Sequence, residues 1–227
     1  RYTLKNNELK HERTIVSGLP GARYHDGVRI TFGPDGYLYV TLGDAGSESA
    51  AQNRENLAGS ILRYTDEGEV PAENPYGNAV YSYGHRNPQG LAWDNAGNLW
   101  STEHGRSGVL SGYDELNLIL SGANYGWPEI QGNEEAEGMV SPKRHSGSEV
   151  TWAPGGLAYL DGSLYIPGLR GETLYEVVID GAEIIAWHEY FVEEYGRLRS
   201  VVVGHDKMLY VLTSNRDGRG IAHDTDD

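Results

Sequence analysis

Four segments of the sequence share one layout, and this repeat constrains the fold more than any other feature. Each segment has a turn rich in Asp, Asn, Gly or Lys, then Leu with an aromatic residue, then an alternating run with a polar or glycine-rich exit. The segments are FGPDGYLYVTLGD (32–44), WDNAGNLWSTEHG (93–105), YLDGSLYIPGLRG (159–171) and GHDKMLYVLTSNR (204–216). Their shared leucines are 61, 65 and 45 residues apart. A unit that recurs at such spacing indicates an array of similar supersecondary elements.

Each repeat is predicted to contain about four β-strands. Asp-Gly and Asn-Ala-Gly turns are typical of hairpins, because glycine adopts the positive φ that tight turns require. One more strand-like run precedes each turn, and one or two follow it. Four-stranded sheets arranged around an axis form a β-propeller. We therefore expect an all-β fold, a β-propeller with about four blades visible in this chain, and a single domain over residues 1–227.

The charge of the chain narrows its possible partners. With 33 Asp and Glu against 18 Lys and Arg, the formal net charge is −15. This argues against nucleic acid as the main partner, because a phosphate backbone calls for a basic face. An acidic, lysine-poor surface fits either a high-salt habitat or an ordinary acidic protein. The absence of cysteine excludes disulfides and thiolate metal sites, and no apolar run approaches the ~18 residues of a membrane span.

Polar residues follow or precede the predicted strands, and in a propeller such residues converge at the axis. His25 precedes one strand and Asp44 ends the next. In adjacent antiparallel strands of similar length the two positions come close together. A carboxylate beside an imidazole raises its basicity, as a general base requires. A solvated turn histidine is the equally weighted alternative for His25.

Arginines form a second group at the blade ends. Arg197 and Arg199 lie two residues apart on a predicted strand, and we expect them to share a face. Guanidinium groups that converge on one axis repel each other unless an anion lies between them, and their planar forks match carboxylates. The full set is Arg86, Arg170, Arg197 and Arg199. It predicts a small, multiply anionic ligand such as a polycarboxylate, with separate surface salt bridges as the alternative.

One short stretch, YSYGHRNPQGLAWD (81–94), holds more hydrogen-bonding side chains than a turn needs. A turn uses Asn, Pro and Gly, yet His85, Arg86 and Gln89 are present as well. Such a concentration in a loop at a blade end indicates a binding role.

Calcium is a weaker prediction from the residues. Asp114, Glu115 and the region of Tyr125 offer hard oxygen ligands, and calcium accepts mixed shells of carboxylates and carbonyls. Trp152 lies where the chain enters a strand, so it either packs in a blade core or stacks on a flat ligand.

The sequence contains, in this order, the stretches YHDGVRITFGPDGYLYVTLGDAG, YSYGHRNPQGLAWD, NYGWPEIQG and GRLRSVVVGHDKMLYVLTSNRDGRG. Together they resemble the soluble quinoprotein sugar dehydrogenases, the aldose/glucose dehydrogenase family that uses pyrroloquinoline quinone (PQQ), and they follow the order of that family. The pair GHRNPQGLAWD and NYGWP is highly specific, whereas DGYLYV occurs in many propellers.

The resemblance implies a six-bladed propeller with PQQ, a planar tricarboxylate, on its axis and calcium beside it. It implies oxidation of an aldose at the anomeric carbon to the lactone, by hydride transfer to the quinone. His25 resembles the general base and Asp44 its partner. Arg86 and Asn87 match the donors at the reacting quinone oxygens, so that the stretch 81–94 is expected to face the quinone.

Further residues take roles from the same resemblance. Arg197 and Arg199 match the pair that binds the cofactor carboxylates, and Arg170 stands where family members mostly have lysine. The remaining matches are the carbonyls of Gly105 and Arg106 for the cofactor calcium, Glu115 and Tyr125 for a structural calcium, and Trp152 for the cofactor pocket. The implied partners are an aldose substrate and an external electron acceptor, and the implied location is periplasmic or extracellular.

Against the family pattern, the chain begins near the third blade and stops before the last strand. We therefore expect a propeller that is incomplete at both ends. The alternative function is a non-catalytic propeller that binds carbohydrate or a protein partner. A hydrolase built on His25, Asp44 and a serine is disfavoured, because no G-x-S-x-G sequence is present.

Overall fold

Short strands dominate the structure, because apolar alternation runs for only a few residues before Gly, Asp or Asn turns the chain. The computed structural model describes residues 1–106 and 112–222. The first strands are β1 (Thr3–Lys5), β2 (Glu8–Lys10), β3 (Ile30–Phe32), β4 (Leu38–Leu42), β5 (Ser60–Tyr64), β6 (Val80–Tyr83), β7 (Pro88–Trp93) and β8 (Leu99–Glu103), with a 3₁₀ helix at Glu48–Gln52. Those that follow are β9 (Glu115–Ile119), β10 (Arg144–His145), β11 (Ala158–Leu160), β12 (Ser163–Pro167), β13 (Leu174–Asp180), β14 (Glu183–Tyr190), β15 (Leu198–Val203) and β16 (Leu209–Thr213).

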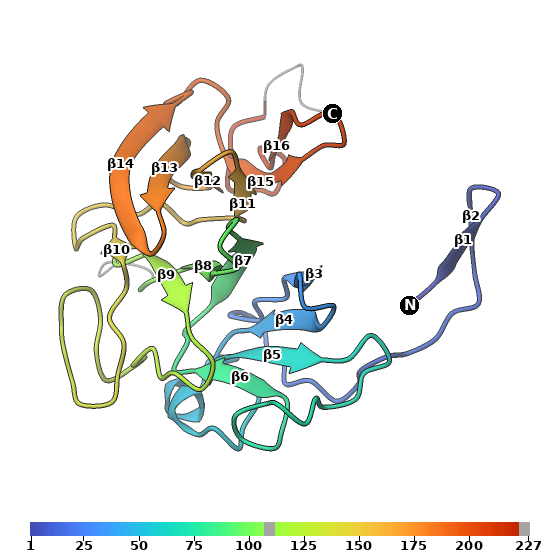
Figure 1. Ribbon diagram of the computed structural model, residues 1–227. Coiled ribbons are helices and arrows are strands. Elements are labelled where there is room, and N and C mark those ends of the chain that lie inside the picture. The colour runs from blue at the N-terminus through green and yellow to red at the C-terminus, as the bar shows by residue number, and fades with distance from the viewer. Residues whose placement is uncertain (107–111, 223–227) are drawn as a thin grey trace.

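Three four-stranded antiparallel sheets follow one another along the chain, each with its strands in sequence order. They contain β3 to β6, β7 to β10, and β11 to β14, and the hairpin β15–β16 begins a fourth unit. The sheets fan out around a common centre, with β3, β7, β11 and β15 innermost (Figure 1). This arrangement confirms the predicted β-propeller.

The sequence repeat corresponds to the second strand of each unit. Leu38, Leu99 and Leu209 begin β4, β8 and β16, and Leu164 is the second residue of β12. The prediction of about four strands per repeat is confirmed for three units, whereas the last unit contains two strands among the described residues.

The core lies between the sheets, because successive side chains of a strand point to opposite faces. Tyr39 and Ile61 pack toward the second sheet in a cluster with Leu91. Their neighbours Val40 and Leu62 pack on the other face of the same sheet. β4 and β5 therefore contribute to two layers of the core, as a radial stack of sheets requires.

The innermost strands are tied together around the centre by Arg29. Its Nε donates to the carbonyl of Gln89 at 3.0 Å, and Nη2 donates to the carbonyl of Gly155 at 2.9 Å. Those two carbonyls belong to β7 and to the segment before β11. At Gly155 a Cβ atom would overlap the carbonyl of Arg199 in β15. One guanidinium group and one glycine thus hold four inner segments close together.

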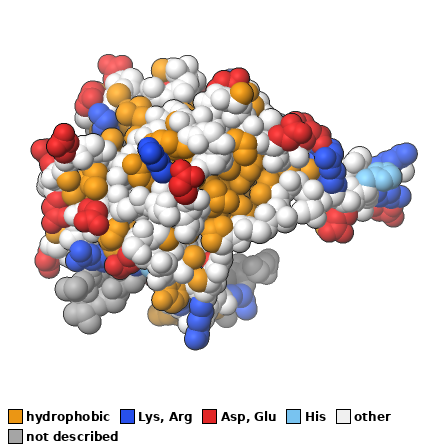
Figure 2. Space-filling model, turned by 90° about the horizontal axis from the view of Figure 1, so that it is seen from below, with side chains coloured by type: hydrophobic (Ala, Val, Ile, Leu, Met, Phe, Trp, Pro, Cys, Tyr) orange, Lys and Arg blue, Asp and Glu red, His pale blue; other side chains and the backbone are white. Residues whose placement is uncertain are grey.

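Two apolar faces remain exposed at the two ends of the fan. At one end, Ile30 and Phe32 of β3 are 60% and 57% exposed. At the other end, Tyr210 and Leu212 of β16 are 52% and 56% exposed. Figure 2 shows hydrophobic side chains gathered on the side of the body from which the N-terminal arm extends. No helix among the described residues is long and apolar enough to cross a membrane.

Candidate functional site

The predicted pair of His25 and Asp44 is brought together at the end of the first sheet. Nδ1 of His25 lies 2.8 Å from Oδ1 of Asp44, which is fully buried, while His25 is half-buried. His25 has a φ of 59°, in the left-handed region. Its backbone passes so close to Gly43 that a Cβ there would overlap the carbonyl of His25. Glycine at position 43 is therefore what lets the imidazole reach the carboxylate.

Asp44 is held in one orientation by three donors. Besides His25, the backbone N–H of Gly46 donates to Oδ1 at 2.8 Å, and Nε1–H of Trp127 donates to Oδ2 at 2.9 Å. Burial acts to raise the pKa of Asp44, but the hydrogen bonds from His25, Gly46 and Trp127 outweigh it and lower the pKa below its usual value. Asp44 therefore stays a carboxylate beside the imidazole. Trp127 was not predicted as a site residue, although it lies within the specific NYGWP motif.

Some side chains of the stretch 81–94 hold the loop in place, and others lie at the site. His85 is fully buried and lies between the hydroxyl of Ser82 and the carboxylate of Glu103, at 2.9 Å from each. It stacks on Tyr125 and does not face the site. The side chain of Gln89 donates to Oδ1 of Asn87 at 3.0 Å. The expectation that the whole stretch faces a ligand is therefore corrected: His85 and Gln89 support it from behind.

Arg86 and Asn87 lie next to the His25–Asp44 pair. The backbone N–H of Asp44 donates to the carbonyl of Arg86 at 2.8 Å, and Gly27 N–H donates to Oδ1 of Asn87 at 3.0 Å. With Oδ1 occupied, the amide NH₂ of Asn87 is the group that can donate to a ligand. The Arg86 guanidinium lies 5.3 Å from the ring of Trp127. Burial lowers the pKa of Arg86, and the charge of Asp44 opposes that effect.

The predicted arginines fall into two environments. Arg197 is buried, and it donates to Asp217 at 3.0 Å and to the carbonyl of Leu169 at 3.1 Å. Arg199 and Arg170 are exposed. A bulge between Leu198 and Ser200 interrupts the alternation on which the prediction of a shared face rested. For Arg197 the structure shows the alternative that was left open, a salt bridge, here to Asp217.

Arg199 instead belongs with two other positive groups near the centre. Burial lowers the pKa of Arg29, and the charge of Arg199 lowers it further. The pKa of His104 is lowered mainly by burial, with Arg86 and Arg199 adding to the effect. Arg199 therefore lies near Arg29, and Arg86 and Arg199 both lie near His104. Arg29 was missed because it lies inside a strand-like run with no recognisable loop pattern.

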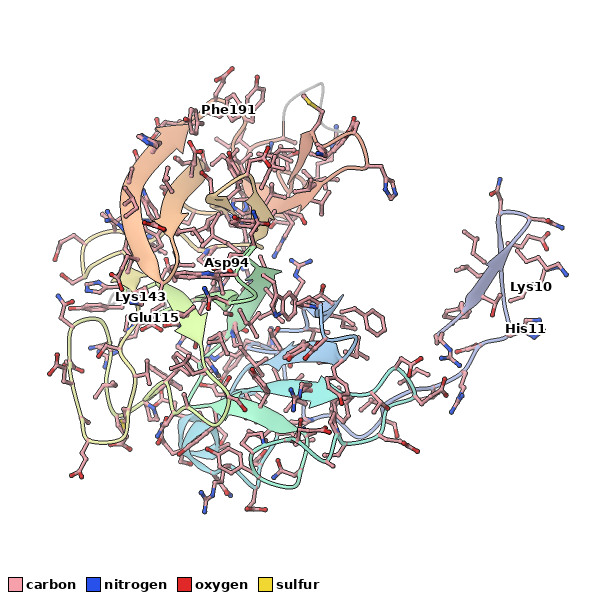
Figure 3. All side chains as sticks on the ribbon, in the orientation of Figure 1. Lys10, His11, Asp94, Glu115, Lys143 and Phe191 are labelled. Atoms are coloured by element: carbon pink, nitrogen blue, oxygen red, sulfur yellow. The ribbon has the colours of Figure 1, made fainter. Side chains whose placement is uncertain are left out.

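The residues predicted for two separate calcium ions, Gly105 and Arg106 for one and Glu115 and Tyr125 for the other, line one small cavity. It encloses about 20 Å³, enough for one small ion or water, between Gly105, Arg106, Glu115 and Tyr125. Glu115, labelled in Figure 3, is the first residue of β9 and is half-buried. Burial raises the pKa of Glu115 to about 8, with the charge of Glu103 adding to the effect. Oε1 of Gln131, in the same cavity, is buried and has no hydrogen-bond partner among the described residues.

These donors fit a calcium ion. A cation would relieve the burial of the Glu115 carboxylate and would satisfy the amide oxygen of Gln131. Across residues 1–106 and 112–222, no three His, Asp or Glu side chains gather as a metal-binding group, so carbonyl and amide oxygens would have to complete the shell. Asp114 does not line this cavity, and its oxygens accept from Gly105 N–H at 2.9 Å and Ala153 N–H at 2.8 Å.

Trp152 occupies the core between the second and third sheets. It is 6% exposed and stacks on Trp187 with ring centres 4.9 Å apart. This position favours the first of its two predicted roles, packing in a blade core. Contact with a flat ligand stays a prediction.

Fold and site together define a β-propeller protein that carries an imidazole–carboxylate pair and several arginines near its centre. A protein-family model described as Glucose / Sorbosone dehydrogenase matches residues 1–222. The chain belongs to this family, the soluble PQQ-dependent sugar dehydrogenases. The predicted resemblance is confirmed.

Two curated relatives and one solved structure illustrate the similarity. The chain is 31% identical to aldose sugar dehydrogenase YliI of Escherichia coli (strain K12), over 91% of this chain and 62% of the relative. It is 35% identical to the uncharacterized protein slr1608 of Synechocystis sp., over 88% of this chain and 56% of the relative. The PQQ-bound form of aldose sugar dehydrogenase from Streptomyces coelicolor matches with a TM-score of 0.89 at 43% identity, over 97% of this chain and 65% of that chain. The chain therefore spans less than two thirds of the length of these three proteins.

Proposed function

We propose that the protein is a PQQ-dependent aldose dehydrogenase, which oxidises the sugar at its anomeric carbon to the lactone. The observation that carries the proposal is the His25–Asp44 pair at 2.8 Å, with Arg86 and Asn87 held beside it. The PQQ bound to the relative from Streptomyces coelicolor supports the choice of cofactor.

His25 would act as the general base. A carboxylate can only accept, so Nδ1 of His25 carries the proton shared with Asp44, and Nε2 keeps its lone pair. Nε2 takes the proton of the anomeric hydroxyl. The C–H electron pair leaves the anomeric carbon as hydride, and the C–O bond becomes the carbonyl of the lactone. Bound PQQ would supply the two-electron acceptor for that hydride.

Arginines and an amide would hold the cofactor. Arg86 and the NH₂ of Asn87 would donate where negative charge develops on the acceptor. Arg199 and Arg170 offer exposed guanidinium groups for its carboxylates. Arg197 would join them only by sharing its charge between the ligand and Asp217.

Calcium is part of the same proposal. Glu115 and Gln131 would hold it in the small cavity, which Gly105 and Arg106 also line. Its charge would compensate Glu115 and would lie close to Arg86, which lines the same cavity. We further propose an external electron acceptor and a periplasmic or extracellular location, both from the family.

The test is a titration of the purified protein with PQQ and calcium, followed by addition of an aldose. Saturable binding with bleaching of the quinone absorbance on adding sugar supports the dehydrogenase. Binding of PQQ without bleaching by any aldose, or binding of sugar without PQQ, would favour the non-catalytic propeller instead.

A further inference from the structure

Glu103, at the end of β8, is a buried carboxylate that lines the small cavity and takes no part in the proposed transfer of proton and hydride. It is 3% exposed. Its oxygens accept hydrogen bonds from three consecutive residues of the facing loop: from Nδ1 of His85 at 2.9 Å, from the backbone N–H of Arg86, and from the backbone N–H of Asn87 at 3.1 Å. A buried carboxylate is stable only when it is fully hydrogen-bonded or paired with charge, and here the loop supplies those bonds.

The bonds to Glu103 complete a clamp on the loop backbone. Asp44 N–H binds the carbonyl of Arg86 at 2.8 Å, and His104 N–H binds the carbonyl of Asn87 at 3.2 Å. Both peptide groups of each residue are therefore fixed, Arg86 between Glu103 and Asp44, and Asn87 between Glu103 and His104. The directions in which the two side chains leave the backbone follow from this clamp.

His85 makes the clamp rigid from behind. Its imidazole donates to Glu103 through Nδ1 and accepts from the Ser82 hydroxyl through Nε2. It also stacks on Tyr125 with ring centres 4.7 Å apart. Glu103 therefore has little freedom to turn away from the loop.

We propose that Glu103 is the positioning residue of the site: its carboxylate aligns Arg86 and Asn87 before any ligand binds. What these two residues then bind rests on the proposed function, whereas the alignment is a property of the protein without cofactor. Preorganised donors of this kind do not have to reorient when charge develops on a ligand.

The test compares Glu103→Ala and Glu103→Gln with wild type in the cofactor-free full-length protein, by amide hydrogen exchange. Alanine removes the acceptor, so exchange at Arg86 and Asn87 is expected to accelerate by about 100-fold. Glutamine retains an oxygen for both N–H groups, and its NH₂ can donate to a His85 whose proton has moved to Nε2. Exchange in Glu103→Gln is expected to stay within about 10-fold of wild type.

A second readout is the affinity for PQQ. If Glu103 had a purely structural role, its substitution would lower this affinity in proportion to the loss of stability. We expect a dissociation constant raised about 10-fold or more by Glu103→Ala and about 3-fold or less by Glu103→Gln. Ser82→Ala is the matched control, because it removes the other hydrogen bond of His85 and leaves both backbone bonds intact. If Glu103→Ala does not fold, Glu103→Asp, whose shorter side chain cannot reach both N–H groups, takes its place.

Unchanged exchange at Arg86 and Asn87 in a folded Glu103→Ala or Glu103→Asp variant would overturn the proposal. Equal losses in the glutamine and alanine variants would also overturn it. If wild type binds no PQQ, the proposed function fails, and the exchange experiment still decides the role of Glu103.

Discussion

Two imidazole–carboxylate pairs lie at the loop 85–87. They differ in their exposure to solvent, and this difference indicates different roles. The His85–Glu103 pair is closed off from solvent on both sides. The His25–Asp44 pair has a buried carboxylate and a partly exposed imidazole. Only an imidazole with an accessible nitrogen can take a proton from a substrate, so His25 is suited to catalysis and His85 to support.

His25→Ala should therefore lower turnover by roughly 10²–10⁴-fold, as for loss of a general base. PQQ binding should remain nearly intact, because the arginines and Asn87 are unchanged. Steady-state kinetics and a PQQ titration of the full-length protein measure the two effects. His205→Ala, in an exposed turn, is the control. Unchanged turnover in His25→Ala would remove this residue from the mechanism.

Trp127 acts on the base through Asp44. Trp127→Phe keeps a ring near Arg86 but loses the N–H that holds Oδ2 of Asp44. We expect turnover to fall about 10-fold with little change in the KM for sugar, because one charge-assisted hydrogen bond is lost. Trp93→Phe, whose ring packs on Tyr39 in the core, is the matched control. Equal effects of the two substitutions would assign the loss to packing alone.

The raised pKa of Glu115 predicts that the stability of the protein depends on pH. Its pKa is about 8 in the folded protein against a usual 4.5. Between these values the folded protein holds a proton that the unfolded chain has released, so the free energy of unfolding should fall as pH rises through this window. Urea unfolding of wild type and Glu115→Gln, at pH 5 and pH 8 with a chelator, measures the difference.

Calcium should remove that dependence, because a bound cation favours the carboxylate form. We expect the wild-type protein to lose stability between pH 5 and pH 8, and Glu115→Gln to lose none. Added calcium should restore the stability of the wild-type protein at pH 8. A wild-type protein that loses no more stability than the glutamine variant would show that Glu115 is not a buried, proton-bearing group.

At the scale of the elements, the two shortest inner strands, β3 and β11, depend on contacts across the centre more than on their own length. β3 and β11 have three residues each, too few to be stable as isolated hairpins. Arg29 supplies bonds to the second and third units, and Gly155 allows the close approach of β15 beside it.

Arg29→Ala should consequently destabilise the protein by about 1.5–3 kcal/mol, the range for hydrogen bonds to a charged group. It leaves two inner carbonyls without their donor, and it also removes a charge beside Arg199. Chemical denaturation measures the change. Arg23→Ala, at an exposed position of the preceding loop, should change stability little. If Arg29→Ala loses no more stability than that control, the hydrogen bonds of Arg29 do not stabilise the inner segments.

At the scale of the whole molecule, the two exposed apolar faces are the dominant feature. Exposed sheet faces and edges of this kind promote association. A protein of residues 1–227 alone should therefore self-associate, which sedimentation velocity at several concentrations would reveal.

If the two apolar faces cause the association, one charged residue introduced on either face should weaken it. Phe32→Glu and Tyr210→Glu, one on each face, are expected to shift the distribution toward monomer. Leu120→Glu, at an exposed apolar position just after β9, should leave it unchanged. A monomer at all concentrations would show that the faces are not adhesive.

The amino-acid sequence determined the strand repeat, the propeller class and the meeting of His25 with Asp44. These follow from local alternation, turn chemistry and antiparallel pairing, which act over a few residues and repeat along the chain. It also indicated Arg86, Asn87 and the NYGWP motif through their resemblance to a known family.

Only the tertiary structure decided which polar residues face the site and which support it. Trp127 binds Asp44, Glu103 holds the backbone at Arg86, and Asp217 neutralises Arg197, each across 17 or more residues of sequence. The physical reason is that a hydrogen-bond partner is set by three-dimensional distance and burial. Two histidines in similar loops look alike in the sequence, and packing between the sheets leaves one accessible and encloses the other.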